Sequence, residues 1–157
     1  MTPRIDIYKY LTSDAAQAML KLGKAVEHSG LEQSLLELLK IRGSQINGCA
    51  YCIDMHTKDA RALGETEQRI YALSAWRETP FFSERERAAL EWTEAITHIA
   101  ETHVPDEVYE RVRRQFDEPQ LVALTFAVVE INAWNRLATT FRAPAGSYQR
   151  EAAHATT

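Results

Sequence analysis

The chain has 157 residues, of which 45% are hydrophobic and 25% are charged, as is ordinary for a globular protein of one domain. Its 18 basic and 22 acidic residues give a formal net charge of -4, so the basic excess typical of nucleic-acid-binding proteins is missing. No apolar run approaches the ~18 residues that a membrane span needs, and the first residues lack the apolar core of a signal peptide. We therefore expect a cytoplasmic protein that binds neither nucleic acid nor a membrane.

The distribution of turn-forming and apolar residues predicts an all-α fold. Six glycines and five prolines are too few for the frequent turns of β-sandwiches and barrels. Apolar residues recur with helical period in seven segments. These segments span residues 13–28, 31–46, 49–63, 66–79, 83–100, 105–116 and 117–141. We expect a single all-helical domain over residues 1–148, with no significant sheet and a loose tail over 149–157.

Two of these helices allow more specific predictions about burial. The helix over 31–46 is apolar around most of its circumference, which predicts burial on several sides. The helix over 83–100 is expected to bury one stripe of side chains, which comprises Ala89, Trp92, Ile96, Ile99 and Ala100. Trp76 and Trp134 also fall on inner stripes, so we expect them in the core, although Trp134 could instead lie at a pocket rim or a subunit contact.

Cys49, Cys52 and His56 are the residues that suggest chemistry. On an ideal helix their side chains share a stripe about 60° wide. Cα atoms three residues apart on a helix lie ~5 Å apart, which a disulfide accepts, so the pair can close and reopen without moving the fold. Both thiols lie in a first helical turn, where free N–H groups favour a thiolate. His56, one turn further on, can accept or return a proton near neutral pH.

Three polar residues stand in apolar helices without an obvious reason. Glu37 lies between leucines, and its carboxylate needs a partner if it is buried. It could orient the His56 imidazole and hold its tautomer, or it could be a partly exposed acid paired with Lys40. Glu130 is a second acid in apolar surroundings, for which a structural ion pair and a functional role both remain open. Asn132 could cap a neighbouring backbone or line a pocket.

Other classes of Cys-x-x-Cys site fit this sequence less well. A structural zinc ion needs four ligands, and only His98 and His103, on other helices, could complete such a site. A c-type haem requires a His directly after the second Cys, where this chain has Ile53. A thioredoxin fold needs strands around the pair. We therefore expect no metal and no cofactor other than a redox-active disulfide between Cys49 and Cys52.

The set Glu37, Cys49, Cys52 and His56 resembles the core pattern of the AhpD-like alkylhydroperoxidase family, within the carboxymuconolactone decarboxylase superfamily. That pattern has a Glu twelve positions before the first Cys, followed by Cys-x-x-Cys-x-x-x-His. The resemblance covers roughly residues 5–148. Further similarities lie at residues 40–42, 44, 47–48, 51 and 131–136.

The resemblance implies an all-α fold that assembles as trimers or hexamers, with the redox site near a subunit contact. It also implies thiol peroxidase activity, in which Cys52 attacks the peroxide and becomes a sulfenic acid. Cys49 would then close the disulfide, while Glu37 and His56 relay protons. Tyr51 stands where some members carry a second His, so the relay here has one basic group fewer.

The same resemblance implies the partners of the protein. These are a hydroperoxide substrate, a dithiol or lipoyl-bearing protein as the reductant, and further copies of this chain. Two alternatives stay open at the level of sequence. One is a lactone decarboxylase of the same superfamily that works without redox turnover, and the other is a non-catalytic helical oligomer stabilised by a metal.

Overall fold

The computed structural model describes residues 2–150, and within that range it is built from helices without any strand. Eight α-helices and two 3-10 helices follow in chain order. They are η1 Ile7–Tyr10, α1 Asp14–Glu27, α2 Gln33–Asn47, α3 Ala50–Ala62, α4 Glu67–Ala72, η2 Leu73–Glu78, α5 Glu84–Thr97, α6 Ile99–Thr102, α7 Asp106–Val112 and α8 Glu118–Phe141. The predicted all-α class is confirmed. Residues 151–157 of the predicted tail lie outside the described residues.

Helix α2 lies at the centre of the fold. It packs against α3, α5 and α8, and nine of its fifteen residues are buried, as its apolar circumference predicts. The larger hydrophobic core joins α1, α2, α5 and α8 around side chains such as Leu36, Leu39 and Leu124. A smaller core around Leu38 and Trp76 joins α2 to η2 and α5.

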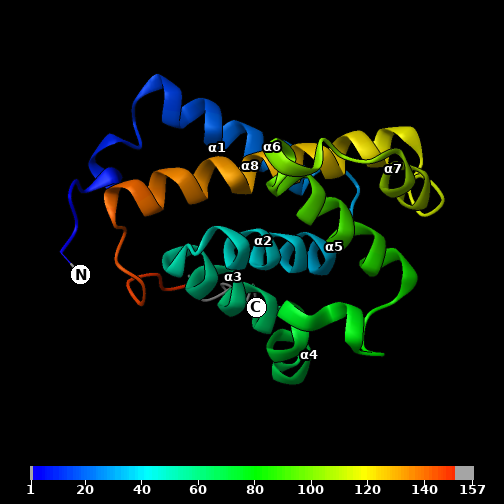
Figure 1. Ribbon diagram of the computed structural model, residues 1–157. Helices are drawn as coiled ribbons and strands as arrows, with labels where there is room; N and C mark the ends of the chain where they lie inside the picture. The colour runs from blue at the N-terminus through cyan, green and yellow to red at the C-terminus, as the bar shows by residue number, and fades with distance from the viewer. Residues whose placement is uncertain (1, 151–157) are drawn as a thin grey trace, which may run out of the picture.

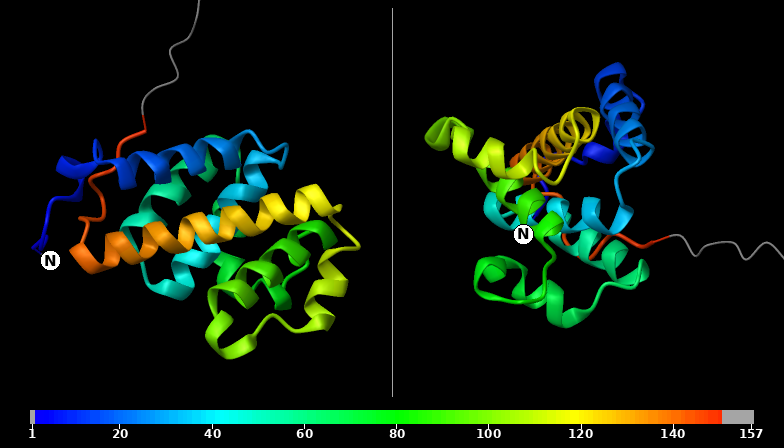
Figure 2. Two further views of the ribbon diagram at one scale, coloured as in Figure 1. Left: turned by 90° about the horizontal axis from the view of Figure 1, so that it is seen from above. Right: turned by 90° about the vertical axis from the view of Figure 1, so that its right-hand side faces the viewer.

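Helix α8 runs along the length of the molecule, with α1 beside it (Figures 1 and 2). Within residues 2–150 it is the one helix that is long and apolar enough to cross a membrane by length and composition, although polar residues such as Glu130 and Asn132 interrupt its apolar run. Half of that stretch is buried in the fold, in contact with α1, α2, α3 and α5. Burial of this kind is what the core helix of a globular domain shows.

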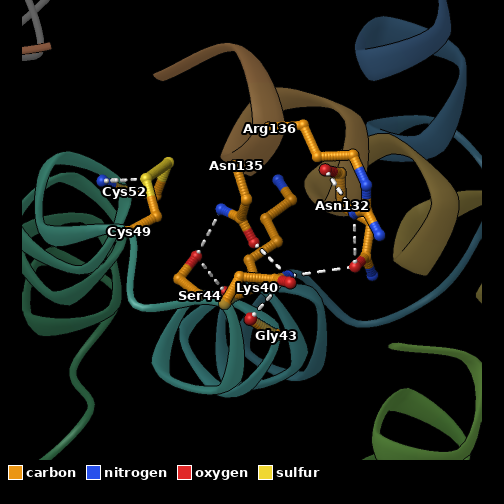
Figure 3. The surroundings of a disulfide bond; sticks show 9 residues. Lys40, Gly43, Ser44, Cys49, Cys52, Asn132, Asn135 and Arg136 are labelled. Atoms are coloured by element: carbon orange, nitrogen blue, oxygen red, sulfur yellow. Dashed lines mark hydrogen bonds between the residues drawn. A yellow bond between two sulfur atoms is a disulfide. The ribbon is translucent and has the colours of Figure 1, made fainter. Parts of the chain in front are cut away.

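A cluster of buried polar side chains joins α8 to α2. The Asn47 amide donates hydrogen bonds to the side-chain oxygens of Asn132, at 3.0 Å, and Asn135, at 2.9 Å. The Asn135 amide in turn donates to Ser44 Oγ at 3.0 Å. Figure 3 shows Asn132 and Asn135 of α8 above α2. Asn132 therefore links two helices through side chains, while its own amide also donates to the Val128 carbonyl.

The helix predicted over 83–100 is shorter than expected. It begins at its capping box of Ser83 and Glu86, but the backbone leaves helical geometry at His98 and the short α6 follows. Because of this break Ile99 is 54% exposed, and Ala100 is exposed as well. The prediction of a buried stripe is therefore wrong at its C-terminal end, where the change in direction turns the side chains outward.

The predicted tryptophans divide into two groups. Trp76 and Trp92 are buried in the two cores, as predicted. Trp134 is half-buried and lies at the rim of a cavity, which was the second interpretation of this residue. The helix predicted over 66–79 is divided into α4 and η2, with non-helical backbone angles at Ala75.

The turn between α2 and α3 sets the position of the cysteine pair. Gly48 ends α2 in the left-handed conformation, at φ 66° and ψ 28°. Cys49 follows as the N-cap of α3, and its sulfur accepts a hydrogen bond from the Cys52 N–H at 3.3 Å. The chain thus reverses within two residues, and α3 folds back along α2.

We expect Gly48→Ala to lower the free energy of unfolding by about 1 kcal/mol, because a side chain disfavours the left-handed conformation. No atom lies within 4 Å of a Cβ added at this position, so the cost is conformational and not steric. Gly48→Asn is the matched control and should cost less, since Asn tolerates this conformation. Urea unfolding of the three proteins measures the difference, and an Ala variant as stable as wild type would contradict the prediction.

Candidate active site

Cys49 and Cys52 are joined by a disulfide bond at the start of α3 (Figure 3). Their Cα atoms lie 5.4 Å apart, in agreement with the spacing expected on a helix. Both residues are buried, with exposures of 2% and 1%. Cys49 precedes α3 as its N-cap, with extended backbone angles, and only Cys52 lies within the helix. The stripe predicted for an ideal helix therefore holds for Cys52 and His56 but not for Cys49, and the cycling of the disulfide stays a prediction.

Glu37 on α2 faces His56 on α3. The carboxylate Oε2 lies 2.8 Å from His56 Nδ1, and Oε1 accepts a hydrogen bond from Lys40 Nζ at 3.3 Å. All three residues are buried, at 6–7% exposure. Glu37 therefore contacts both of its predicted partners, His56 and Lys40, with one carboxylate oxygen each. The acid is buried, however, whereas the predicted pairing with Lys40 assumed that it is partly exposed.

This pairing fixes the charge state of the acid and the tautomer of the imidazole. Burial by itself raises the pKa of Glu37, but the hydrogen bond and charge of His56, together with Lys40, outweigh burial and hold the pKa below its ordinary value. An ionised carboxylate only accepts hydrogen bonds, so His56 Nδ1 carries the proton. The other ring nitrogen, Nε2, is then the basic one in the neutral imidazole.

A cavity of about 420 Å³ lies over this group. Its polar wall contains Cys52, His56, Glu37 and Lys40, with Glu130 from α8. The apolar part of the wall is formed by residues from η1, α1, α3 and α8, which are Ile7, Leu11, Leu20, Met55, Trp134 and Ala138. Cys49 does not line this cavity. The structure therefore brings Glu37, Cys52 and His56 together at the wall of one cavity, to which Cys49 does not belong.

Asp59 and Tyr148 belong to the same site but were not singled out from the sequence. Tyr148 donates a hydrogen bond from its hydroxyl to Asp59 at 2.9 Å, and burial together with the Asp59 carboxylate raises the pKa of Tyr148 to about 12. Asp59 lies seven residues after Cys52, which places it on the same helix face, so its spacing offered a signal. Tyr148 reaches the site through the path of the chain after α8, which no local pattern indicates.

The residues that could share a metal ion differ from those expected from the sequence. His98 pairs with Glu101 on the next turn, and neither His98 nor His103 lines the cavity. Among residues 2–150, the one group of three side chains close enough to share an ion is Glu37, His56 and Asp59, with ligand atoms within 4.8 Å. These atoms already bind one another, Lys40 and Tyr148, so an ion would have to displace those partners.

We expect Glu37→Gln to lower the free energy of unfolding by about 3 kcal/mol at neutral pH, because it leaves the Lys40 ammonium buried without a counter-charge. Since the folded-state pKa of Glu37 is lowered, its stabilisation is present above its ordinary pKa of 4.5 and is lost as the pH falls through the folded-state value. The difference between wild type and variant should therefore shrink below pH 4.5.

The double variant Glu37→Gln with Lys40→Met is the control for this experiment. Removal of the ammonium should recover much of the lost stability, as seen when buried ion pairs are replaced by apolar side chains of similar size. Urea unfolding at several pH values measures both effects. Equal stability of the single and double variants would contradict the ion-pair explanation.

Comparison with known proteins places this chain in a family. The sequence model of the Carboxymuconolactone decarboxylase family matches residues 13–95. The uncharacterized protein YdfG of Bacillus subtilis (strain 168) is 49% identical over 137 residues, which are 87% of this chain and 92% of YdfG.

Solved structures show the same fold. A crystal structure of a protein of unknown function from Agrobacterium tumefaciens, described as a candidate antioxidant defence protein AhpD, has 43% identity and a TM-score of 0.88, over 94% of this chain and 100% of that one. The debrominase Bmp8 has 20% identity and a TM-score of 0.73 over 85% of this chain and 72% of its own, which shows a shared fold alone. The chain therefore belongs to the carboxymuconolactone decarboxylase family and has the fold of its AhpD-like members.

Proposed function

We propose that this protein is a thiol-dependent hydroperoxidase in which Cys52 and Cys49 cycle between dithiol and disulfide. The observation that carries the proposal is the convergence of Cys52, His56 and Glu37 on one cavity. A disulfide beside an oriented base has the parts that a thiol peroxidase needs. The antioxidant description of the relative from Agrobacterium tumefaciens supports the same activity.

In the reduced protein, His56 is the group that generates the thiolate. Its Nε2 is the basic nitrogen because Nδ1 is bound to Glu37, and the ring lies one helical turn after Cys52 on the same face. The ionised Glu37 stabilises the imidazolium that forms when the thiol proton is transferred. The first-turn N–H groups of α3 stabilise the thiolate itself.

The oxidative half-reaction then proceeds in two steps. The Cys52 thiolate attacks the terminal oxygen of the hydroperoxide, so an S–O bond forms, the O–O bond breaks, and the alkoxide takes the proton from His56 and leaves as an alcohol. The Cys49 thiolate next attacks the Cys52 sulfenic acid. The S–S bond forms, and hydroxide leaves and is protonated to water. Two thiols and one hydroperoxide thus give one disulfide, one alcohol and one water.

The reductive half-reaction requires a dithiol, which we propose is a dithiol or lipoyl-bearing protein. Thiol–disulfide exchange would open the Cys49–Cys52 bond through a mixed disulfide and return both thiols. Such a cycle fits a reducing, cytoplasmic compartment. Over the whole cycle the hydroperoxide is reduced to an alcohol, and the dithiol reductant is oxidised to a disulfide.

We expect Cys52→Ser to reduce turnover of cumene hydroperoxide with dihydrolipoamide to the rate of the reductant alone, because the hydroxyl of Ser is a poor nucleophile beside a thiolate. Cys49→Ser is the matched control. It should keep one equivalent of peroxide consumption per chain, since Cys52 is still oxidised, but it should lose multiple turnover. Full activity of Cys52→Ser would exclude the proposal.

A thiol count separates this activity from a lactone decarboxylase of the same superfamily. One equivalent of hydroperoxide should remove both thiols of the reduced protein together, and a dithiol should restore them. Decarboxylase activity that survives alkylation of both cysteines would favour the alternative. Metal analysis of protein purified without chelators tests the third candidate, for which about one ion per chain is expected.

We also propose that the protein assembles as a homo-oligomer, a trimer or a hexamer. Helix α8 exposes an apolar row formed by Val122, Phe126, Val129 and Leu137, which lie within about 80° of one another on an ideal helix. A row of this kind is a typical contact surface between protein chains.

We expect Phe126→Lys combined with Val129→Lys to lower the mass measured by light scattering to that of smaller species, because burial of two ammonium groups disfavours the contact. Tyr71→Lys, on the exposed side of α4, is the control and should leave the mass unchanged. A wild-type protein that is monomeric at all concentrations would refute the assembly.

A further inference from the structure

Glu130 on α8 is a buried acid that the proposed cycle does not use. It is 7% exposed, and it lines the cavity that also contains Cys52 and His56. Its Oε2 atom is fully buried and has no hydrogen-bond partner within residues 2–150. Buried polar atoms in native proteins are nearly always paired, so the carboxyl group of Glu130 has unused hydrogen-bonding capacity at the wall of the cavity.

The position of Glu130 is supported by a glycine on the neighbouring helix. A Cβ added to Gly23 of α1 would lie 3.2 Å from Glu130 Oε1, tighter than ordinary contact between these atoms. Glycine inside a helix is destabilising relative to alanine, and here its small size leaves room for the carboxyl group. The packing of α1 on α8 therefore accommodates an acid at this place in the cavity wall.

The charged groups around Glu130 come from three helices. Lys24 and Glu27 lie on α1, Glu37 and Lys40 on α2, and His56 and Asp59 on α3. Burial is the main influence and raises the pKa of Glu130, while Lys40, His56 and the Trp134 side chain act against it and Glu27 adds to it. The surroundings of Glu130 therefore favour the neutral form of its carboxyl group more than those of Glu37 do. A protonated carboxyl both donates and accepts hydrogen bonds.

The cavity sets further conditions on whatever pairs with Glu130. Much of the wall is apolar, including Leu20, Met55 and Trp134, so an occupant with an apolar body is favoured by burial. Its polar end must be able to hydrogen-bond a carboxyl group in a space that also holds Cys52. Glu27, Glu37 and Asp59 line the same cavity beside Lys24 and Lys40, so the wall offers no net positive charge to attract an anion. A neutral organic hydroperoxide meets each of these conditions.

We propose that Glu130 is a substrate-binding residue whose carboxyl group hydrogen-bonds an oxygen of a neutral organic hydroperoxide with an apolar body. This inference rests on the proposed function and adds a substrate-binding residue to the same cavity. Glu130 takes no part in thiolate formation, which His56 and Glu37 provide. Its contribution is to hold the substrate while the apolar wall binds the remainder of the molecule.

The test compares Glu130→Leu with Glu130→Gln, using cumene hydroperoxide and dihydrolipoamide. Glu130→Leu removes the hydrogen bond at similar size, and we expect it to raise KM about fivefold with kcat nearly unchanged. Glu130→Gln keeps a donor and an acceptor and should restore most of the affinity. Glu118→Gln, at an exposed acid of the same helix that does not line the cavity, is the control and should leave KM at the wild-type value.

Two measurements separate substrate binding from a structural role. Replacement of an unpaired buried polar group by an apolar one is neutral or stabilising, so Glu130→Leu should unfold at or above the wild-type temperature. The redox-inert product, 2-phenyl-2-propanol, should bind the disulfide form more weakly in Glu130→Leu, as measured by calorimetry. An unchanged KM and unchanged alcohol affinity in Glu130→Leu, or an equal KM increase in Glu130→Gln, would overturn the inference.

The outcomes for Glu130 and for the peroxidase activity are distinguishable. If wild type consumes cumene hydroperoxide and Cys52→Ser does not, but the Glu130 variants match wild type, the inference about Glu130 fails by itself. If wild type is inactive with every hydroperoxide, the proposed function is wrong. The assignment of Glu130 as a residue that binds a hydroperoxide is then wrong as well. Binding of the alcohol would then report only on the cavity as a site for neutral apolar molecules.

Discussion

The ion pair of Glu37 with Lys40 and His56 is the interaction on which the arrangement of the site depends. A carboxylate in the central helix would be strongly unfavourable if it were alone. Here Oε1 binds Lys40 and Oε2 binds His56, so the buried charges compensate each other. The same contact joins α2 to α3 and orients the imidazole. Stability of the central helices and orientation of the His56 imidazole therefore have one physical origin.

Two carboxyl groups in one cavity have opposite pKa shifts, and the difference follows from their surroundings. Glu37 has a hydrogen-bond partner for each oxygen, so its pKa is lowered despite burial. Glu130 has a buried oxygen without a partner, and its pKa is raised by burial. Titratable groups whose environments separate their pKa values are suited to different roles. One acid is thereby suited to stabilising an imidazolium, the other to hydrogen-bonding a neutral ligand.

Local patterns predicted the parts of the structure that depend on residues close in sequence. The start of the helix predicted over 83–100, the burial around α2 and the stripe shared by Cys52 and His56 all follow from short-range geometry. The prediction was wrong at Ile99, because helical periodicity does not reveal where a helix breaks and changes direction. It also treated Lys40 and His56 as competing partners of Glu37, whereas a carboxylate has two oxygens and binds both.

The sequence by itself determined the helical class and the face of α3 that carries Cys52 and His56, since each is set by the spacing of neighbouring residues. Only the tertiary structure decided which side chains share the cavity. The contributions of Glu130, Gly23 and Tyr148 depend on how α1, α8 and the segment after α8 pack around α2 and α3. Those contacts join residues about a hundred positions apart, and side-chain packing, which has no local signature, determines them.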